Sequence, residues 1–150
     1  IKRVRDYIGE EPFLLTYGDG VADLNVAELV KFHQSHGKLV TISAYNAGQR
    51  FGVLDIGEDG GIREFREKTQ GDGNLINIGF MVCQPEFMDY IEGDSTMLEK
   101  APLERAAQDG QLMAYKHKGF WQCMDTVREK EALEKLWAVG QAPWKVWDNR

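Results

Sequence analysis

The order strand, helix, strand near the start of the chain constrains the fold more than any other feature. Residues 12–17, "PFLLTY", form an almost wholly apolar run, which is typical of a strand covered on both faces. Residues 25–37, "NVAELVKFHQSHG", have helical spacing, with Asn25 placed as N-cap and Gly37 as the stop. Residues 39–45, "LVTISAY", form the next strand. This order predicts a βαβ unit with parallel pairing, and therefore an α/β fold.

The remaining segments extend the same kind of fold. The patterns predict the end of a helix at 1–9, a hairpin at 51–68, a buried strand at 75–84, a short helix opened by Pro85, a helix at 98–109, an exposed strand at 111–119 and a surface helix at 126–140. We find no internal repeat and no linker in the sequence. A single domain covering residues 1–150 is the simplest organisation for a chain of this length.

Charge and cysteine content exclude several classes of function. The 150 residues carry 24 acids against 18 lysines and arginines, a net charge of −6, so a basic face for nucleic acid is not expected. No apolar run reaches the roughly 18 residues that a membrane span requires. Cys83 and Cys123 have no metal-binding spacing, which favours a reducing cytoplasm and leaves open a single disulfide. The chain has no signal peptide and starts inside a helical pattern without methionine, so we expect a piece of a longer protein.

Two acids, Asp19 and Asp23, follow the first strand in "TYGDGVADL". Ligands in open α/β sheets collect at the carboxyl ends of strands, and the glycines beside Asp19 leave room for a ligand. A Gly-Asp-Gly turn without function is the simpler interpretation of this stretch alone. Near the other end of the chain, Asp125 in "GFWQCMDT" is either the N-cap of the next helix or a metal ligand that pairs with Asp19.

Two further segments carry candidate site residues. Glu67 and Lys68 close the hairpin before a Gly-rich loop, where the lysine could hold a phosphate or be a solvated charge. Asn77 and Gly79 lie in the buried strand, where the amide needs either a structural hydrogen bond or a ligand.

The histidines and the common hydrolase motifs give no further site. His33, His36 and His117 lack an acid or cysteine at ligand spacing, so we interpret all three as structural or surface residues. The sequence contains no GxSxG, HExxH or Walker loop.

Taken in order, the motifs "TYGDGVADL", "RFGVLD", "EK" before a Gly-rich loop, "INIGF", "GFWQCMDT" and "APWKVW" resemble the glucose-1-phosphate cytidylyltransferases. These enzymes belong to the sugar-phosphate nucleotidyltransferases. The resemblance runs from about residue 1 to 147. It implies a Rossmann-like nucleotidyltransferase fold with a mixed, mostly parallel sheet, here incomplete at the N-terminus. It also implies transfer of CMP from CTP to glucose-1-phosphate, giving CDP-glucose and pyrophosphate.

The resemblance assigns a role to each matching residue. It implies that Asp19 and Asp125 hold Mg²⁺, and that Lys68 neutralises the sugar phosphate. The residues that it places on the substrate are Tyr17, Gly18, Glu67, Lys68, Asn77 and Gly79. Catalysis would consist of positioning an in-line attack and neutralising charge.

The sequence departs from the family pattern in four ways. Thr69 and Cys123 stand where the family usually has proline, and Ile78 stands where it has a second glycine, which would reshape the sugar pocket. The GGxGTR loop and Pro-Lys pair that bind the triphosphate do not occur in this sequence. We therefore expect the second part of such an enzyme, with an exposed sheet edge that self-associates or binds the missing N-terminal segment.

Two alternatives stay open at this point. One is a related enzyme of the same superfamily that uses another base or sugar. The other is a fragment without catalysis that binds a sugar nucleotide or forms oligomers.

Overall fold

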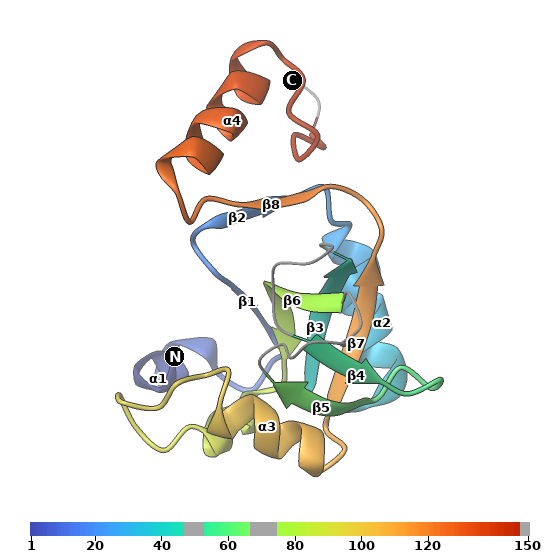
Figure 1. Ribbon diagram of the computed structural model, residues 1–150. Helices are drawn as coiled ribbons and strands as arrows, with labels where there is room; N and C mark the ends of the chain where they lie inside the picture. The colour runs from blue at the N-terminus through green and yellow to red at the C-terminus, as the bar shows by residue number, and fades with distance from the viewer. Residues whose placement is uncertain (47–52, 67–74, 148–150) are drawn as a thin grey trace.

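In the computed structural model, which describes residues 1–46, 53–66 and 75–147, a four-stranded mixed sheet forms the centre of the protein (Figure 1). Its strand order is β1-β6-β3-β7. The bounds are β1 (Phe13–Thr16), β6 (Leu75–Cys83), β3 (Val40–Asn46) and β7 (Leu112–His117). The α/β class is therefore confirmed.

The expected parallel pairing of the first two strands is wrong, because β6 lies between them. β6 is antiparallel to both β1 and β3, whereas β3 and β7 are parallel. Strands β1, β3 and β7 therefore run in one direction and only β6 is reversed. A local strand-helix-strand pattern gives the direction of two strands, but it does not reveal a later strand that inserts between them.

Helix α2 (Val26–His36) covers one face of this sheet. Leu29 of α2 packs with Leu24 and Val82 in a small buried cluster. Asn25 accepts a hydrogen bond from the backbone N–H of Glu28, and Gly37 ends the helix at φ 65°, so both predicted helix ends are confirmed.

The opposite face carries the larger core. Its cover consists of the 3₁₀ helix η2 (Pro85–Tyr90), helix α3 (Ala101–Gln108) and the hairpin of β4 (Val53–Ile56) and β5 (Ile62–Arg66). Ile42 and Met81 of the sheet pack there with Phe87 and Leu103, all nearly inaccessible to solvent. Burial of these apolar side chains is the main force that holds the two layers together.

Two predictions about strand burial are wrong. The side chains of β1 alternate between half-buried and exposed, with Leu14 58% exposed, so β1 is not covered on both faces. The strand predicted as exposed at 111–119 is β7, whose Leu112, Met113 and Ala114 are buried against the core. Among the described strands, none pairs with the outer side of β1.

A second, two-stranded ribbon lies beyond the end of the main sheet. It pairs β2 (Gly20–Ala22) antiparallel with β8 (Trp121–Cys123). Helix α4 (Val127–Ala138) and the chain after it lie on the far side of this ribbon, away from the main sheet (Figure 1). The ribbon therefore connects the sheet to the C-terminal part of the chain.

The chain starts with η1 (Lys2–Val4) and α1 (Arg5–Ile8), and Gly9 ends that helix at φ 71° as predicted. Neither Cys83 nor Cys123 forms a disulfide, which closes the alternative left open by the sequence. None of the described helices is long and apolar enough to cross a membrane.

Candidate functional site

The β2–β8 ribbon brings the two predicted metal acids onto adjacent segments. Asp19 lies between β1 and β2, and Asp125 follows β8 directly. The backbone N–H of Met124 donates to the carbonyl oxygen of Asp19 over 2.7 Å, which extends the pairing of Gly20 with Cys123 by one residue. Both carboxylates are exposed to solvent. The fold therefore places on adjacent backbone segments two acids that are far apart in the sequence.

Asp125 is not the N-cap of the helix that follows it. The N-cap of α4 is Thr126, whose hydroxyl accepts from the backbone N–H of Glu129. The Glu129 carboxylate in turn accepts from the backbone N–H of Thr126 over 2.9 Å, which completes a capping box. The T-x-x-E spacing was a sequence signal for this cap. The capping explanation of Asp125 is therefore wrong.

The glycine before Asp19 has free space beside it. A Cβ added to Gly18 would meet no atom within 4 Å, and the backbone of Gly18 is not left-handed. Gly20 is different, because its Cβ would lie 3.2 Å from Nε1 of Trp121. Neither packing nor backbone conformation requires glycine at position 18, and the open space beside it leaves room for a ligand.

Asn77 and Gly79 lie in an irregular part of β6. The register of β6 against β3 shifts between Ile42 and Ala44, where Ile42 pairs with Met81 but Ala44 pairs with Asn77. Gly79 sits in this bulge at φ 82°, a conformation that favours glycine. The side-chain oxygen of Asn77 accepts from the backbone N–H of Gly79 over 3.0 Å. Asn77 therefore has the structural hydrogen bond that the sequence left as one alternative.

Tyr17 packs against the same bulge. Its backbone N–H donates to the carbonyl of Gly79 over 3.1 Å, and a Cβ on Gly79 would come within 2.5 Å of the Tyr17 ring. The Asn77 amide nitrogen lies 3.4 Å from the Tyr17 hydroxyl, which itself donates to Glu99 over 2.6 Å. Burial and the hydrogen bond to Glu99 raise the pKa of Tyr17, so the phenol keeps its proton. Sequence analysis missed Glu99, since no motif marks it.

One cluster of possible metal ligands lies at the end of β8. Ligand atoms of Cys123, Asp125 and Glu129 lie within 4.8 Å of one another. Burial, and then a hydrogen bond to Asp125, raises the pKa of the Cys123 thiol, which makes it a poor ligand for a hard cation. No described basic residue forms an ion pair with Asp19 or Asp125. Carboxylate oxygens are the kind of protein ligand that Mg²⁺ prefers.

Other residues named from the sequence are distributed as follows. Glu67, Lys68 and Thr69 lie outside the described residues. Ile78, at the position of the family's second glycine, is only 3% exposed and thus packs inside the protein. Asp23 is structural, since its carboxylate accepts from the backbone N–H of Phe120 over 2.6 Å and lies 3.1 Å from Nε2 of His117.

The remaining histidines are structural as well. Nδ1 of His33 and Nε2 of His36 both lie within hydrogen-bond distance of the Thr41 hydroxyl, at 2.9 and 2.7 Å. This cluster lies between α2 and β3 and holds the helix on the sheet.

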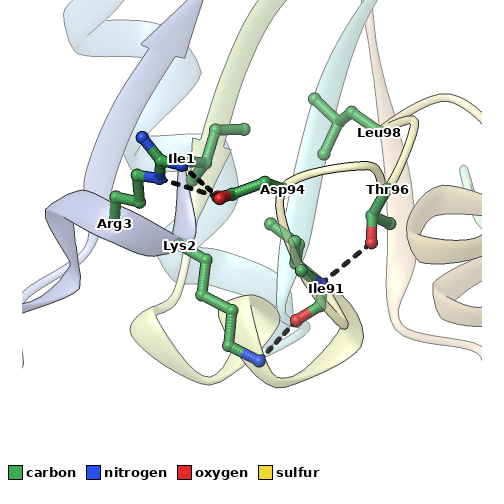
Figure 2. A pocket seen from close by; sticks show the side chains of 8 residues that line it. Ile1, Lys2, Arg3, Ile91, Asp94, Thr96 and Leu98 are labelled. Atoms are coloured by element: carbon green, nitrogen blue, oxygen red, sulfur yellow. Dashed lines mark hydrogen bonds and ion pairs between the residues drawn. The ribbon is translucent and has the colours of Figure 1, made fainter.

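A separate cavity of about 170 Å³ lies between η1 and the loop after η2 (Figure 2). Its charged groups already have partners, because Lys2 donates to the carbonyl of Ile91 over 2.6 Å and Arg3 pairs with Asp94. None of the predicted site residues lines it. We therefore place the candidate site at the end of β1, with the β6 bulge and the β2–β8 ribbon.

Comparison with protein families identifies the family of this chain. The family model described as "Nucleotidyl transferase" matches residues 1–132. A glucose-1-phosphate cytidylyltransferase from Salmonella typhi is 51% identical over 99% of this chain, and a mannose-1-phosphate guanylyltransferase catalytic subunit beta from Drosophila pseudoobscura pseudoobscura is 33% identical over 82%. The chain spans 58% of the first relative and 33% of the second.

Solved structures agree on the fold. A Bacillus anthracis protein, described as a glucose-1-phosphate thymidylyltransferase in complex with sucrose, has a TM-score of 0.74 at 16% identity, covering 99% of this chain and 61% of that one. HddC from Yersinia pseudotuberculosis has a TM-score of 0.72 at 20% identity, covering 87% of this chain and 57% of that one. At such low identity these structures support the fold alone.

Proposed function

Because this chain belongs to the nucleotidyl transferase family, we propose that its protein transfers CMP from CTP to glucose-1-phosphate, releasing pyrophosphate and CDP-glucose. The 51% identity to a glucose-1-phosphate cytidylyltransferase supports this choice of base and sugar. One observation carries the proposal furthest: the β2–β8 ribbon holds Asp19 and Asp125 on adjacent segments, beside the bulge that contains Asn77.

The two acids bind the divalent cation of the reaction. Asp19 and Asp125 offer hard carboxylate oxygens, both exposed and without a basic partner among the described residues. Mg²⁺ prefers one or two carboxylates together with phosphate oxygens and water. When bound, Mg²⁺ neutralises phosphate charge as the sugar phosphate attacks the α-phosphorus of CTP.

The β6 bulge and the loop after β1 receive the sugar phosphate. Gly18 leaves room for it, and the amide of Asn77 has one N–H that does not face Tyr17 and can donate to a sugar hydroxyl. Glu67 and Lys68 complete the site in this proposal, the carboxylate on sugar hydroxyls and the ammonium on the phosphate. The protein then acts mainly by holding the two substrates in line.

We also infer that the edge of β1 pairs with a second copy of the protein or with an N-terminal segment of the full-length protein. A separate inference is that the protein works in the cytoplasm. Leu14 exposes apolar surface beside backbone groups that no described strand pairs. Such an edge is a template for another strand. The two reduced cysteines are consistent with a reducing compartment.

The test uses the full-length gene product, since the chain spans 58% of the relatives that carry the name. Purified protein is incubated with glucose-1-phosphate, Mg²⁺ and each of CTP, UTP, GTP and dTTP, and pyrophosphate release is followed. We expect turnover with CTP at a kcat/KM at least about tenfold above that with the other nucleotides. Preference for another nucleotide would assign the protein to another branch of the family.

A second arm tests the alternative of binding without catalysis. Calorimetry with CDP-glucose measures binding independently of turnover. Binding without pyrophosphate release from any nucleotide would overturn the enzymatic proposal in favour of a sugar-nucleotide-binding protein.

A further inference from the structure

Glu99 lies at one end of a continuous series of hydrogen bonds that reaches the proposed sugar site. The Tyr17 hydroxyl donates to Oε1 of Glu99 over 2.6 Å, and Nδ2 of Asn77 lies 3.4 Å from that hydroxyl oxygen. Oδ1 of Asn77 accepts from the backbone N–H of Gly79 over 3.0 Å. Glu99 precedes α3, whereas Asn77 and Gly79 lie in β6, so the series connects two layers of the protein.

The direction of each hydrogen bond follows from the first one. A carboxylate can only accept, so the single phenolic proton of Tyr17 must point to Glu99. The hydroxyl oxygen then has only lone pairs left for Asn77, which favours the NH₂ group of the amide on that side. The amide oxygen consequently faces the backbone N–H of Gly79. The hydrogen bond from Tyr17 to Glu99 is stronger than one to a neutral acceptor, because the carboxylate is charged.

We propose that Glu99 is a positioning residue for the sugar-phosphate site: through Tyr17 it fixes the orientation of the Asn77 amide and the shape of the β6 bulge. This inference rests on the proposed function for the identity of the ligand. Burial and the hydrogen bond to Glu99 raise the pKa of Tyr17, so the phenol stays a donor across the physiological range.

Loss of Glu99 frees the phenolic proton. Tyr17 can then donate to the amide oxygen of Asn77, which turns the amide and leaves the Gly79 N–H without its acceptor. The amide would present an acceptor where the sugar meets a donor. The effect on the reaction is therefore weaker binding of the sugar phosphate rather than a slower chemical step.

The test compares variants of the full-length protein by their kinetics with glucose-1-phosphate. We expect Glu99→Ala and Tyr17→Phe each to raise KM about tenfold with kcat changed less than about threefold. The double variant should be no worse than Tyr17→Phe alone, because Glu99 acts through Tyr17. Glu99→Gln keeps an acceptor oxygen and should restore KM to within about threefold of wild type. Glu104→Ala, an exposed acid on α3, is the matched control.

A second readout does not depend on the substrate. Hydrogen exchange of peptides covering residues 76–80 should speed up in Glu99→Ala and not in Glu104→Ala, while peptides from α3 stay unchanged. If wild type shows no turnover but this exchange difference is found, the proposed function fails and the role of Glu99 in positioning stands. Unchanged KM together with unchanged exchange in Glu99→Ala, or multiplying effects in the double variant, would overturn the inference.

Discussion

The backbone N–H of Met124 donates a 2.7 Å hydrogen bond to the carbonyl oxygen of Asp19. This bond lies at the end of the ribbon in which Gly20 pairs with Cys123. One residue further along the second segment is Asp125. The separation of the two acids is therefore set by the pairing of backbone groups, and both side chains are exposed to solvent.

Removing either acid should abolish metal-dependent turnover in the full-length protein. Asp19→Asn and Asp125→Asn keep the shape of the side chain but remove the charge that Mg²⁺ needs, so we expect kcat/KM to fall at least about 100-fold, or about 2.7 kcal/mol. Asp6→Asn, on the exposed helix α1, is the matched control. Pyrophosphate release measures all three. Activity near wild type in both site variants would mean that the acids are not the metal ligands.

Two glycine substitutions should separate folding from binding. Gly79→Ala meets a left-handed backbone and a Tyr17 ring atom 2.5 Å away, so we expect a loss of about 2–4 kcal/mol in the free energy of unfolding. Gly18→Ala meets no neighbour and should stay within about 0.5 kcal/mol of wild type while weakening sugar-phosphate binding. Urea unfolding and calorimetry report the two quantities. Equal stability losses would contradict the assignment of Gly18 to ligand approach.

The capping box at α4 predicts different costs for two neighbouring residues. Thr126→Ala removes the side-chain acceptor for the Glu129 N–H and should cost about 1 kcal/mol of stability. Asp125→Ala removes no cap and should cost less than about 0.5 kcal/mol. Chemical denaturation of the two variants compares them directly. A larger loss for Asp125→Ala would show that this acid has a structural role.

The histidine cluster predicts that stability falls as pH is lowered. One ring nitrogen of each residue is placed to accept: Nδ1 of His36 accepts from the backbone N–H of Lys38, and Nε2 of His33 lies 3.0 Å from the Gln84 amide nitrogen. Burial is the main cause that lowers the pKa of His36 to about 4 and also lowers the pKa of His33. Both rings are therefore neutral in the folded protein at neutral pH.

The sign follows from the unfolded chain, in which the histidine pKa is 6.5. Stability from the neutral rings is present above that value and is lost as pH falls toward about 4, the folded pKa of His36. Urea midpoints between pH 7.5 and 4.5 measure the loss. His36→Gln removes one titrating ring and should flatten the dependence. An unchanged slope in that variant would rule out His36 as its source.

The free side of β1 predicts association that a single charge can suppress. Leu14→Lys places an ammonium on the edge strand and should lower the apparent mass of the chain in sedimentation. Leu14 is 58% exposed, so the cost in stability should stay near 0.5 kcal/mol, roughly that of other surface changes. Val139→Lys, at an exposed position after α4, controls for charge alone. A monomer in wild type, or equal mass in both variants, would contradict association through this edge.

Local signals in the sequence were sufficient for most helices and strands. Asn25 and Gly37 mark the ends of α2 because capping depends on residues within one turn. The insertion of β6 between β1 and β3 could not be read in this way, since it depends on a segment far along the chain. The exposure of Leu14 could not be predicted for the same reason. An apolar run favours a buried strand, but it does not show whether other segments cover that strand in the fold.

The candidate site also contains some residues that a sequence motif marks and others that only the fold reveals. Asp19 and Asp125 are predicted as site residues from their motifs, whereas the ribbon that places them on adjacent segments has no signal in the sequence. Glu99 has no motif, because its role depends on a tyrosine from another layer of the fold. The cap at Thr126 was visible as T-x-x-E and was overlooked in favour of the acid before it.

The central place of β6 also affects the order in which this chain can fold. Phe13 of β1 pairs with Cys83, so β1 is synthesised long before its partner exists and has no strand to bind in the meantime. β3 has the same partner, and its other neighbour, β7, comes later still. Pairings of such long sequence separation form slowly, because the loop must close before any contact is gained. We therefore expect the end of β1 and Asp19 after it to become ordered only once β6 has docked. Docking of β6 would then limit the rate at which the site forms.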